Sequence, residues 1–252
     1  MLSRILSLVM ALTVAGCVST KRETDEPLRV PYLSTSIDVD GKLDEECYRG
    51  HDPLTAFVVA GNTSREAPST RAWLFWSEER LVCSFECVDS TPAWTAPTAN
   101  ERDVDGQDRA ELFLWTGDPD GPYFCIEAAS AGAVHDYQAR FYRKFDEAWF
   151  PQGGWTHKTL LMPNGYTVEM VLPKSAIEAM GLRLGTGFHL KMGLFRADYD
   201  KFNGQPKWIT WVDRGREPDF HVAESFGTVV FTRASKCAGP SHRFKEPHGE
   251  GD

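Results

Sequence analysis

The stretch at 103–115 changes from an acidic, glycine-containing loop into an apolar run. With the two-residue period of a β-strand, Leu112 and Leu114 point to one face of this run, while Glu111 and Phe113 point to the other. The pattern therefore predicts a strand that carries a carboxylate near its start, where the loop ends. A carboxylate in this position can be held toward a ligand, or it can simply keep a strand edge soluble.

Strand-like runs recur along most of the chain. They lie at 71–76, 81–88, 123–128, 157–162, 166–172, 188–196, 207–212 and 226–232. Turn signals separate several of them, including the dipeptide Asn164-Gly165. One short helix is predicted at 174–180, because Pro173 precedes it and Gly181 follows it. Many short strands with almost no helix indicate an all-β fold: an antiparallel β-sandwich with jelly-roll or immunoglobulin-like layering and one short helix.

The first 17 residues have the pattern of a bacterial lipoprotein signal peptide. A short basic start precedes an apolar run too short to span a membrane stably, and small residues lead to Cys17. We expect acylation of Cys17 and a lipid anchor in the bacterial cell envelope. The alternative is an ordinary signal peptide in which Cys17 is incidental. Val18 stands where a retention signal would place Asp, which favours the outer membrane.

Composition divides the remaining chain into three parts. Residues 18–29 are polar and charged, as in a tether, and residues 234–252 have the composition of a disordered tail. Residues 30–233 are left for the sandwich. The formal net charge of −9 argues against nucleic acid and anionic membrane surfaces as partners. Five cysteines besides Cys17 lack the spacing of a zinc site and are expected to be mostly buried apolar residues.

Several short motifs together resemble the family 9 carbohydrate-binding modules. The motifs are D-G-K-L-D-E at 40–45, the strand 81–89 that ends in Asp89, D-R-A-E at 108–111, G-Y-T-V-E at 165–169 with L-P at 172–173, F-R-A-D at 195–198, W-V-D at 211–213 and F-G at 226–227. Each motif is short, but their order and spacing follow the family over nearly the whole mature chain. The resemblance implies the β-sandwich fold and a non-catalytic, sugar-binding role.

The resemblance also implies ligand-binding residues. In the family, sugar lies between two exposed tryptophan rings, and Trp211 matches one of them, while Glu111 matches a glutamate that accepts sugar hydrogen bonds. Asp105 stands at the spacing of the second ring, so Trp94, earlier in the same loop, is the candidate for that role. Arg196 and Asp213 complete the expected contacts, although Arg196 and Glu111 could instead form a structural ion pair.

Calcium is the expected ion, because the family often carries structural calcium and four loop carboxylates offer hard oxygen ligands. They are Asp103, Asp105, Asp118 and Asp120. Ordinary solvated turn carboxylates are the alternative for each of them. No organic cofactor is expected.

Two other functions fit the same fold class. A glycoside hydrolase would use two carboxylates as acid and base, from among Glu111, Glu127, Glu169 and Asp213. A haem-binding relative of the sandwich would need axial ligands such as Met192 and Lys191. Lys191 and Met192 are adjacent on a strand and therefore point to opposite faces, which weighs against haem.

Overall fold

The computed structural model describes residues 26–97, 100–199, 204–215 and 218–233. The predicted signal peptide, the lipidation site Cys17 and the predicted tail lie outside these residues, as does most of the predicted tether. In the described part of the chain, no helix is long and apolar enough to cross a membrane.

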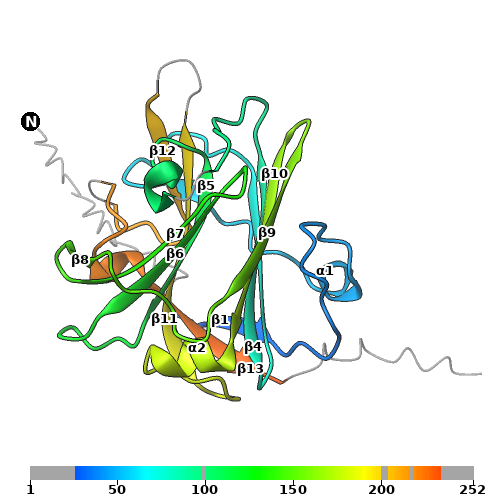
Figure 1. Ribbon diagram of the computed structural model, residues 1–252, viewed down its shortest axis with the longest axis vertical. Helices are drawn as coiled ribbons and strands as arrows, with labels where there is room; N and C mark the ends of the chain where they lie inside the picture. Colours follow the sequence, from blue (N-terminus) through cyan, green and yellow to red (C-terminus); the bar gives the residue numbers. More distant parts are fainter. Residues whose placement is uncertain (1–25, 98–99, 200–203, 216–217, 234–252) are drawn as a thin grey trace, which may run out of the picture.

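Two β-sheets pack against each other, and this arrangement confirms the predicted sandwich (Figure 1). The larger sheet has nine strands. Seven follow one another in the order β1 (Leu28–Pro31), β13 (Gly227–Thr232), β11 (His189–Tyr199), β5 (Arg109–Trp115), β6 (Tyr123–Ala129), β7 (Val134–Arg140) and β8 (Lys144–Asp146). Beside β11 lies β12 (Pro206–Thr210), which in turn pairs with β2 (Val58–Val59). The smaller sheet has the order β3 (Thr70–Trp76), β4 (Arg80–Val88), β10 (Gly165–Pro173) and β9 (Thr156–Met162).

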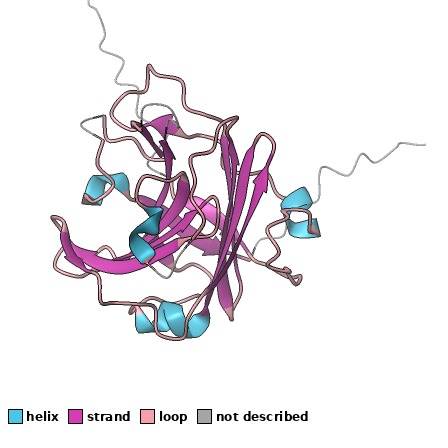
Figure 2. Cartoon of the chain, turned by 45° about the horizontal axis from the view of Figure 1, so that its top comes forward, coloured by secondary structure: helices cyan, strands magenta, loops and turns pink. Residues whose placement is uncertain are grey.

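The helices are short and lie at the periphery of the two sheets (Figure 2). The predicted helix is present as α2 (Lys174–Ala179). A second one, α1 (Glu46–Gly50), lies on the outer side of the smaller sheet (Figure 1), where the hydroxyl of Tyr48 donates to Oε1 of Glu169 at 2.9 Å. Two 3-10 turns, η2 (Glu101–Val104) and η3 (Ala223–Ser225), complete the described elements. The N-terminal strand β1 begins at Leu28, so part of the predicted tether belongs to the sandwich.

The main core lies between the sheets and follows the predicted alternation along β5. Leu112 and Leu114 are fully buried there, together with Val168 and Met170 of β10. Burying such aliphatic side chains contributes about 1.5–3 kcal/mol each.

The outer face of the larger sheet is apolar as well. Phe113 lies there within a second cluster, with the ring of Phe195 at 5.0 Å between centroids in an edge-on arrangement. The chain between β12 and β13 folds over this face and contributes Phe220 and Phe226 to the cluster. For this reason all seven positions of β5 are buried, although only one of its faces points to the other sheet. The rings of this second cluster pack the chain between β12 and β13 onto β5.

Candidate functional site

A cavity of about 300 Å³ lies on the outer face of the nine-stranded sheet. Outward-facing side chains of β5, β6 and β7 form its floor, and β8, β12 and the loop before η3 supply its walls. We call it the Arg109 pocket. It is lined by Arg102, Asp105, Arg109, Glu111, Glu127, His135, Tyr137, Arg143, Phe145, Glu147, Trp208, Pro218, Asp219, Phe220 and His221.

Three buried charged side chains form the floor of the pocket. Nε of Arg109 lies 2.8 Å from Oε1 of Glu111 and 2.8 Å from Oε2 of Glu127. The hydroxyl of Tyr137 donates to Oε1 of Glu127 at 2.8 Å. Strand register explains this cluster, because Glu111 is paired directly with Glu127 across β5 and β6. Arg109 precedes Glu111 by two residues and therefore shares its face of the sheet.

Two atoms of this floor are left without a hydrogen bond. Nε of Arg109 and Oε1 of Glu111 face each other closely, but neither has a hydrogen-bond partner of good geometry in the protein, and both are buried. The two atoms therefore interact as an ion pair of poor hydrogen-bond geometry, which leaves hydrogen-bonding capacity at the floor of the pocket.

The floor has two carboxyl groups but only one guanidinium group to pair with them. Burial, and then the negative charge of Glu127, raise the pKa of Glu111 to about 8, although Arg109 acts in the opposite direction. Burial opposes the charge of Arg109, yet the two carboxylates raise its pKa above the ordinary value for arginine. At pH 7 the floor therefore holds a charged Arg109 beside a largely protonated Glu111, so it can both donate and accept hydrogen bonds.

Flat aromatic rings form part of the pocket wall. Phe220 stacks on Phe195 with 4.0 Å between ring centroids, and the half-buried Trp208 meets Phe220 edge-on at 5.5 Å. Cζ of Arg109 lies 5.7 Å from the centroid of the Trp208 ring. Flat apolar surface beside planar polar groups matches a pyranose ring, which presents C–H groups on its faces and hydroxyls at its edge.

Ion pairs close the rim of the pocket. Glu147 bridges Nη2 of Arg102 at 2.8 Å and Nε2 of His135 at 2.7 Å. Arg143 lies 2.8 Å from Oδ1 of Asp219 on the opposite side. Burial, and then the charge of Arg143, lower the pKa of His221 to about 4, so this ring is neutral at pH 7.

The model of one protein family, described as carbohydrate family 9 binding domain-like, matches residues 39–234. The chain belongs to this family. The match covers almost the whole sandwich and confirms the resemblance seen in the short motifs. None of the curated proteins compared with the chain matches it.

Three solved structures share the fold of this family 9 domain. A Bacteroides uniformis ATCC 8492 protein with a proposed carbohydrate-binding role has a TM-score of 0.64 and 18% identity, over 82% of this chain and 99% of that one. A family 9 module from Caldicellulosiruptor kristjanssonii in complex with cellotriose has a TM-score of 0.58 and 15% identity, and the match covers 84% of this chain and 96% of that one. A family 9 module from the same organism in complex with glucose has a TM-score of 0.54 and 16% identity, and the match covers 85% of this chain and 100% of that one.

The family 9 domain does not bring Trp211 and Glu111 into one site, which corrects the expected arrangement. β12 ends at Thr210, and Trp211 follows it in a bend. The Trp211 ring packs so tightly on Gly227 that an added Cβ there would lie 2.3 Å from it, and its Nε1 donates to the carbonyl of Met192 at 3.3 Å. Trp208, not Trp211, lies beside Glu111 in the Arg109 pocket.

Arg196 lies on the inner face of the nine-stranded sheet and is fully buried, so it does not pair with Glu111. In the register of β11 and β5, Phe195 is opposite Glu111 and Arg196 is opposite Ala110. Adjacent residues of a strand point to opposite faces, which separates the two predicted partners. Arg196 instead bonds to Oδ1 of Asp198 at 2.5 Å, and also donates to the carbonyls of Ser69 and Val88 and to the hydroxyl of Thr70.

The remaining predicted contact residues lie in other places. Asp213 accepts a hydrogen bond from the backbone N–H of Gly61 at 3.0 Å and does not line the Arg109 pocket. The side chain of Trp94 is 51% exposed and lines a separate cavity of about 430 Å³ together with Gln107 and Tyr199. Of the five predicted ligand contacts, Glu111 is therefore the one that the structure places in the Arg109 pocket.

The four carboxylates expected to bind calcium do not converge. Asp103 and Asp105 precede β5, whereas Asp118 and Asp120 follow it. A strand of seven residues separates the two pairs by roughly 20 Å, too far for one ion. Asp105 lies 3.6 Å from Arg102, and Asp118 accepts the backbone N–H of Asp120.

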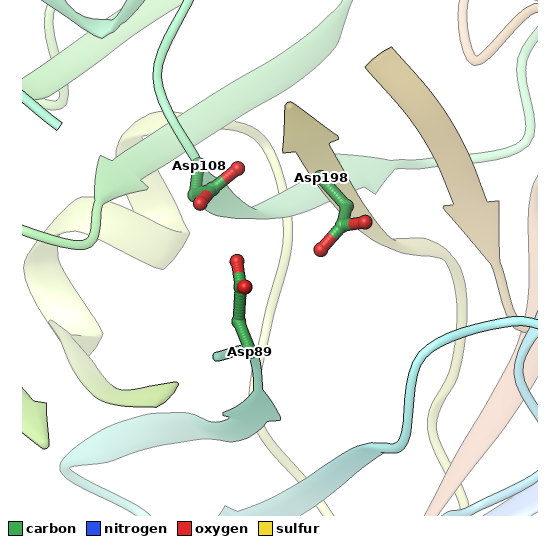
Figure 3. A group of neighbouring side chains, drawn as sticks. All are labelled: Asp89, Asp108 and Asp198. Atoms are coloured by element: carbon green, nitrogen blue, oxygen red, sulfur yellow. The ribbon is translucent and has the colours of Figure 1, made fainter. Parts of the chain in front are cut away.

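Three other aspartates do converge, as Figure 3 shows: Asp89, Asp108 and Asp198 each offer an oxygen within 4.8 Å of the others. Most of these oxygens are already bonded. Asp198 contacts Arg196 and Lys207, and both oxygens of Asp108 accept backbone N–H groups, from Ala93 at 2.6 Å and Tyr199 at 2.5 Å. Calcium needs six to eight oxygen ligands. The cluster as it stands fits a calcium ion poorly.

Burial, and then the neighbouring Asp89, raise the pKa of Asp108 to about 8. A proton on this carboxyl together with the cations of Arg196 and Lys207 balances the charge of the three aspartates without a metal ion.

The two residues considered for haem point to opposite faces of β11, as expected. Met192 is fully buried in the main core, and Nζ of Lys191 donates to the hydroxyl of Thr228 at 2.9 Å. Arg109, which organises the pocket, was not among the predicted contact residues. The available signal was its position two residues before Glu111, on the same face of the strand.

Proposed function

We propose that this family 9 domain binds a sugar unit of a glycan in the Arg109 pocket without catalysing a reaction. Trp208 supplies a flat wall, and Arg109 and Glu111 bond the sugar hydroxyls. We further propose that a lipid on Cys17 tethers the protein in the bacterial cell envelope, with the outer membrane favoured, where it supports the capture or breakdown of polysaccharides.

The observation that carries this proposal is the buried cluster of charged groups at the bottom of an aromatic-walled cavity. Nε of Arg109 and Oε1 of Glu111 are buried and form an ion pair without good hydrogen-bond geometry, and Trp208 lies directly beside Arg109. Relatives with the same fold were solved with cellotriose and with glucose, which supports a glycan as the ligand.

Trp208→Ala should weaken glycan binding by about tenfold to hundredfold, or about 1.4 to 2.8 kcal/mol, because the ligand loses its stacking surface. A glycan array with the purified Cys17→Ser protein would identify a ligand, and calorimetric titration would then compare the variants. Trp211→Ala is the matched control, since Trp211 lies outside the pocket. It should bind glycan like the parent protein but melt at a lower temperature. Equal binding by the Trp208→Ala variant would place the site elsewhere.

A glycoside hydrolase is the second candidate, because the structure brings Glu111 and Glu127 together. Their oxygens lie 2.8 Å from the same nitrogen, close enough for the roughly 5–5.5 Å separation of a retaining pair. However, Nε of Arg109 lies between the two carboxyl groups, where the anomeric carbon would have to react. This favours binding over hydrolysis. Release of sugar product at catalytic protein concentrations, lost in Glu127→Gln, would support the hydrolase instead.

Cys17→Ser should release the protein from the membrane fraction and abolish labelling with palmitate, because the acylated thiol is removed. Fractionation of cells that express the parent protein and the variant measures this. A variant that stays with the membranes would contradict the lipid anchor and leave the sugar-binding proposal unaffected.

A further inference from the structure

We propose that the Arg109 pocket selects a sugar that carries an ammonium group, a hexosamine with a free amine, over neutral and acidic sugars. This inference rests on the proposed function, because it names the ligand class of the same pocket.

The floor of the pocket has more carboxylates than cations. Two buried carboxylates, Glu111 and Glu127, share the single guanidinium of Arg109. A buried carboxylate that lacks its own counter-ion is strongly disfavoured, so the floor has room for one more positive charge. An ammonium group next to Glu111 would supply this charge and would also donate to the carboxylate of Glu111, which otherwise shares Arg109 with Glu127.

The lining of the whole pocket is acidic as well. Five carboxylates line it, but only three guanidinium groups do, which leaves a formal excess of two negative charges before any charge on His135. His221 does not change this sum, because its ring is neutral at pH 7. A cavity with walls of one dominant sign attracts ligands of the opposite charge.

The existing ion pairs of the pocket disfavour acidic sugars. Each guanidinium that lines the pocket already contacts a carboxylate: Arg102 contacts Glu147, Arg109 contacts the floor pair, and Arg143 contacts Asp219. A uronic acid would therefore have to displace a carboxylate of the protein before it could pair with any of these three cations. An amino sugar needs no such exchange.

Binding of the amine should be coupled to the release of a proton from Glu111. At pH 7 the extra negative charge of the floor is neutralised by a proton on Glu111, whose pKa is raised to about 8. A bound ammonium group stabilises the ionised form, so the proton leaves the carboxyl group for the buffer as the ammonium–carboxylate pair forms. Glucose, which brings no charge, should bind without this release.

Calorimetric titration with glucosamine, N-acetylglucosamine, glucose and glucuronate tests the proposal on the full mature chain with Cys17→Ser. At about pH 7 and low salt, glucosamine should bind at least about tenfold more tightly than glucose, and glucuronate more weakly than glucose. The advantage should shrink as salt is added. Only glucosamine should show a binding enthalpy that changes with the ionisation enthalpy of the buffer.

Two variants separate charge from shape. Glu111→Gln keeps the size of the side chain but removes the excess carboxylate, so the preference of glucosamine over glucose should fall to about twofold or less, even though both bind more weakly. Asp118→Asn removes one carboxylate from an exposed turn outside the pocket, and should leave the preference nearly unchanged. Thermal melting confirms that each variant is folded, and Glu127→Gln repeats the test if Glu111→Gln is not.

The outcomes distinguish this proposal from the proposed function. If glucosamine binds no more tightly than glucose, or if N-acetylglucosamine binds equally well, selection of the ammonium group is overturned while sugar binding stands. If none of these sugars and no glycan on the array binds, sugar binding itself fails, and the preference fails with it.

Discussion

Arg196→Met should lower the free energy of unfolding by about 3–5 kcal/mol, the usual cost of removing one partner from a buried ion pair. The side chain is fully buried between the sheets. Its loss would leave the Asp89 and Asp198 carboxylates with less positive charge, and would remove its hydrogen bonds to the carbonyls of Ser69 and Val88 and to the buried hydroxyl of Thr70. Urea denaturation of the two proteins measures the difference.

Arg71→Met is the control for this prediction. Arg71 also pairs with a carboxylate, that of Glu86, but its side chain is 45% exposed. An exposed pair of this kind contributes about 0–1 kcal/mol. A loss of similar size in both variants would show that Arg196 is not the electrostatic centre that its contacts indicate.

The free energy of unfolding should fall as the pH rises from about 4 to about 8. Asp108 has a folded-state pKa of about 8, above the value of about 3.9 in an unfolded chain. The folded protein therefore holds a proton that the unfolded chain releases. The stabilisation is complete below about pH 4 and is lost as the pH passes through about 8. Between about pH 6 and pH 8 the loss is on the order of 2–3 kcal/mol for this group, and Glu111 should add to it in the same direction.

Asp89→Asn should flatten this pH profile, because the like charge that helps to raise the pKa of Asp108 is removed. Asp118→Asn, in an exposed turn, should leave the profile unchanged. Chemical denaturation at a series of pH values measures both variants. A profile that is equally steep in Asp89→Asn would assign the titration to another group.

The sequence predicted calcium on other carboxylates, and chelation tests whether an ion binds instead at the cluster of Asp89, Asp108 and Asp198. An ion bound only to the folded protein would raise its stability by mass action, so chelation would then lower the melting temperature. Because most of the oxygens are already bonded, we expect no shift with excess chelator. A clear decrease, restored by added calcium, would show that a cation rather than a proton balances the three aspartates.

The amino-acid sequence determined the fold class and the face that each residue of β5 occupies. Alternation placed Leu112 and Leu114 in the main core and Glu111 on the opposite face, and both placements follow from the fixed two-residue period of a strand. The order of short motifs identified the family, since turn residues and strand ends are set by local backbone geometry. Local signals of this kind do not depend on which strands become neighbours.

Only the tertiary structure decided which polar side chains meet. Glu111 pairs with Arg109 and Glu127 because β5 and β6 are neighbours in one particular register, and Arg196 is separated from Glu111 by the thickness of a sheet. The assignment of Trp208 rather than Trp211 to the pocket depended on where β12 ends. Strand register, strand ends and loop paths result from the packing of residues far apart in the chain, and a local pattern carries little information about them.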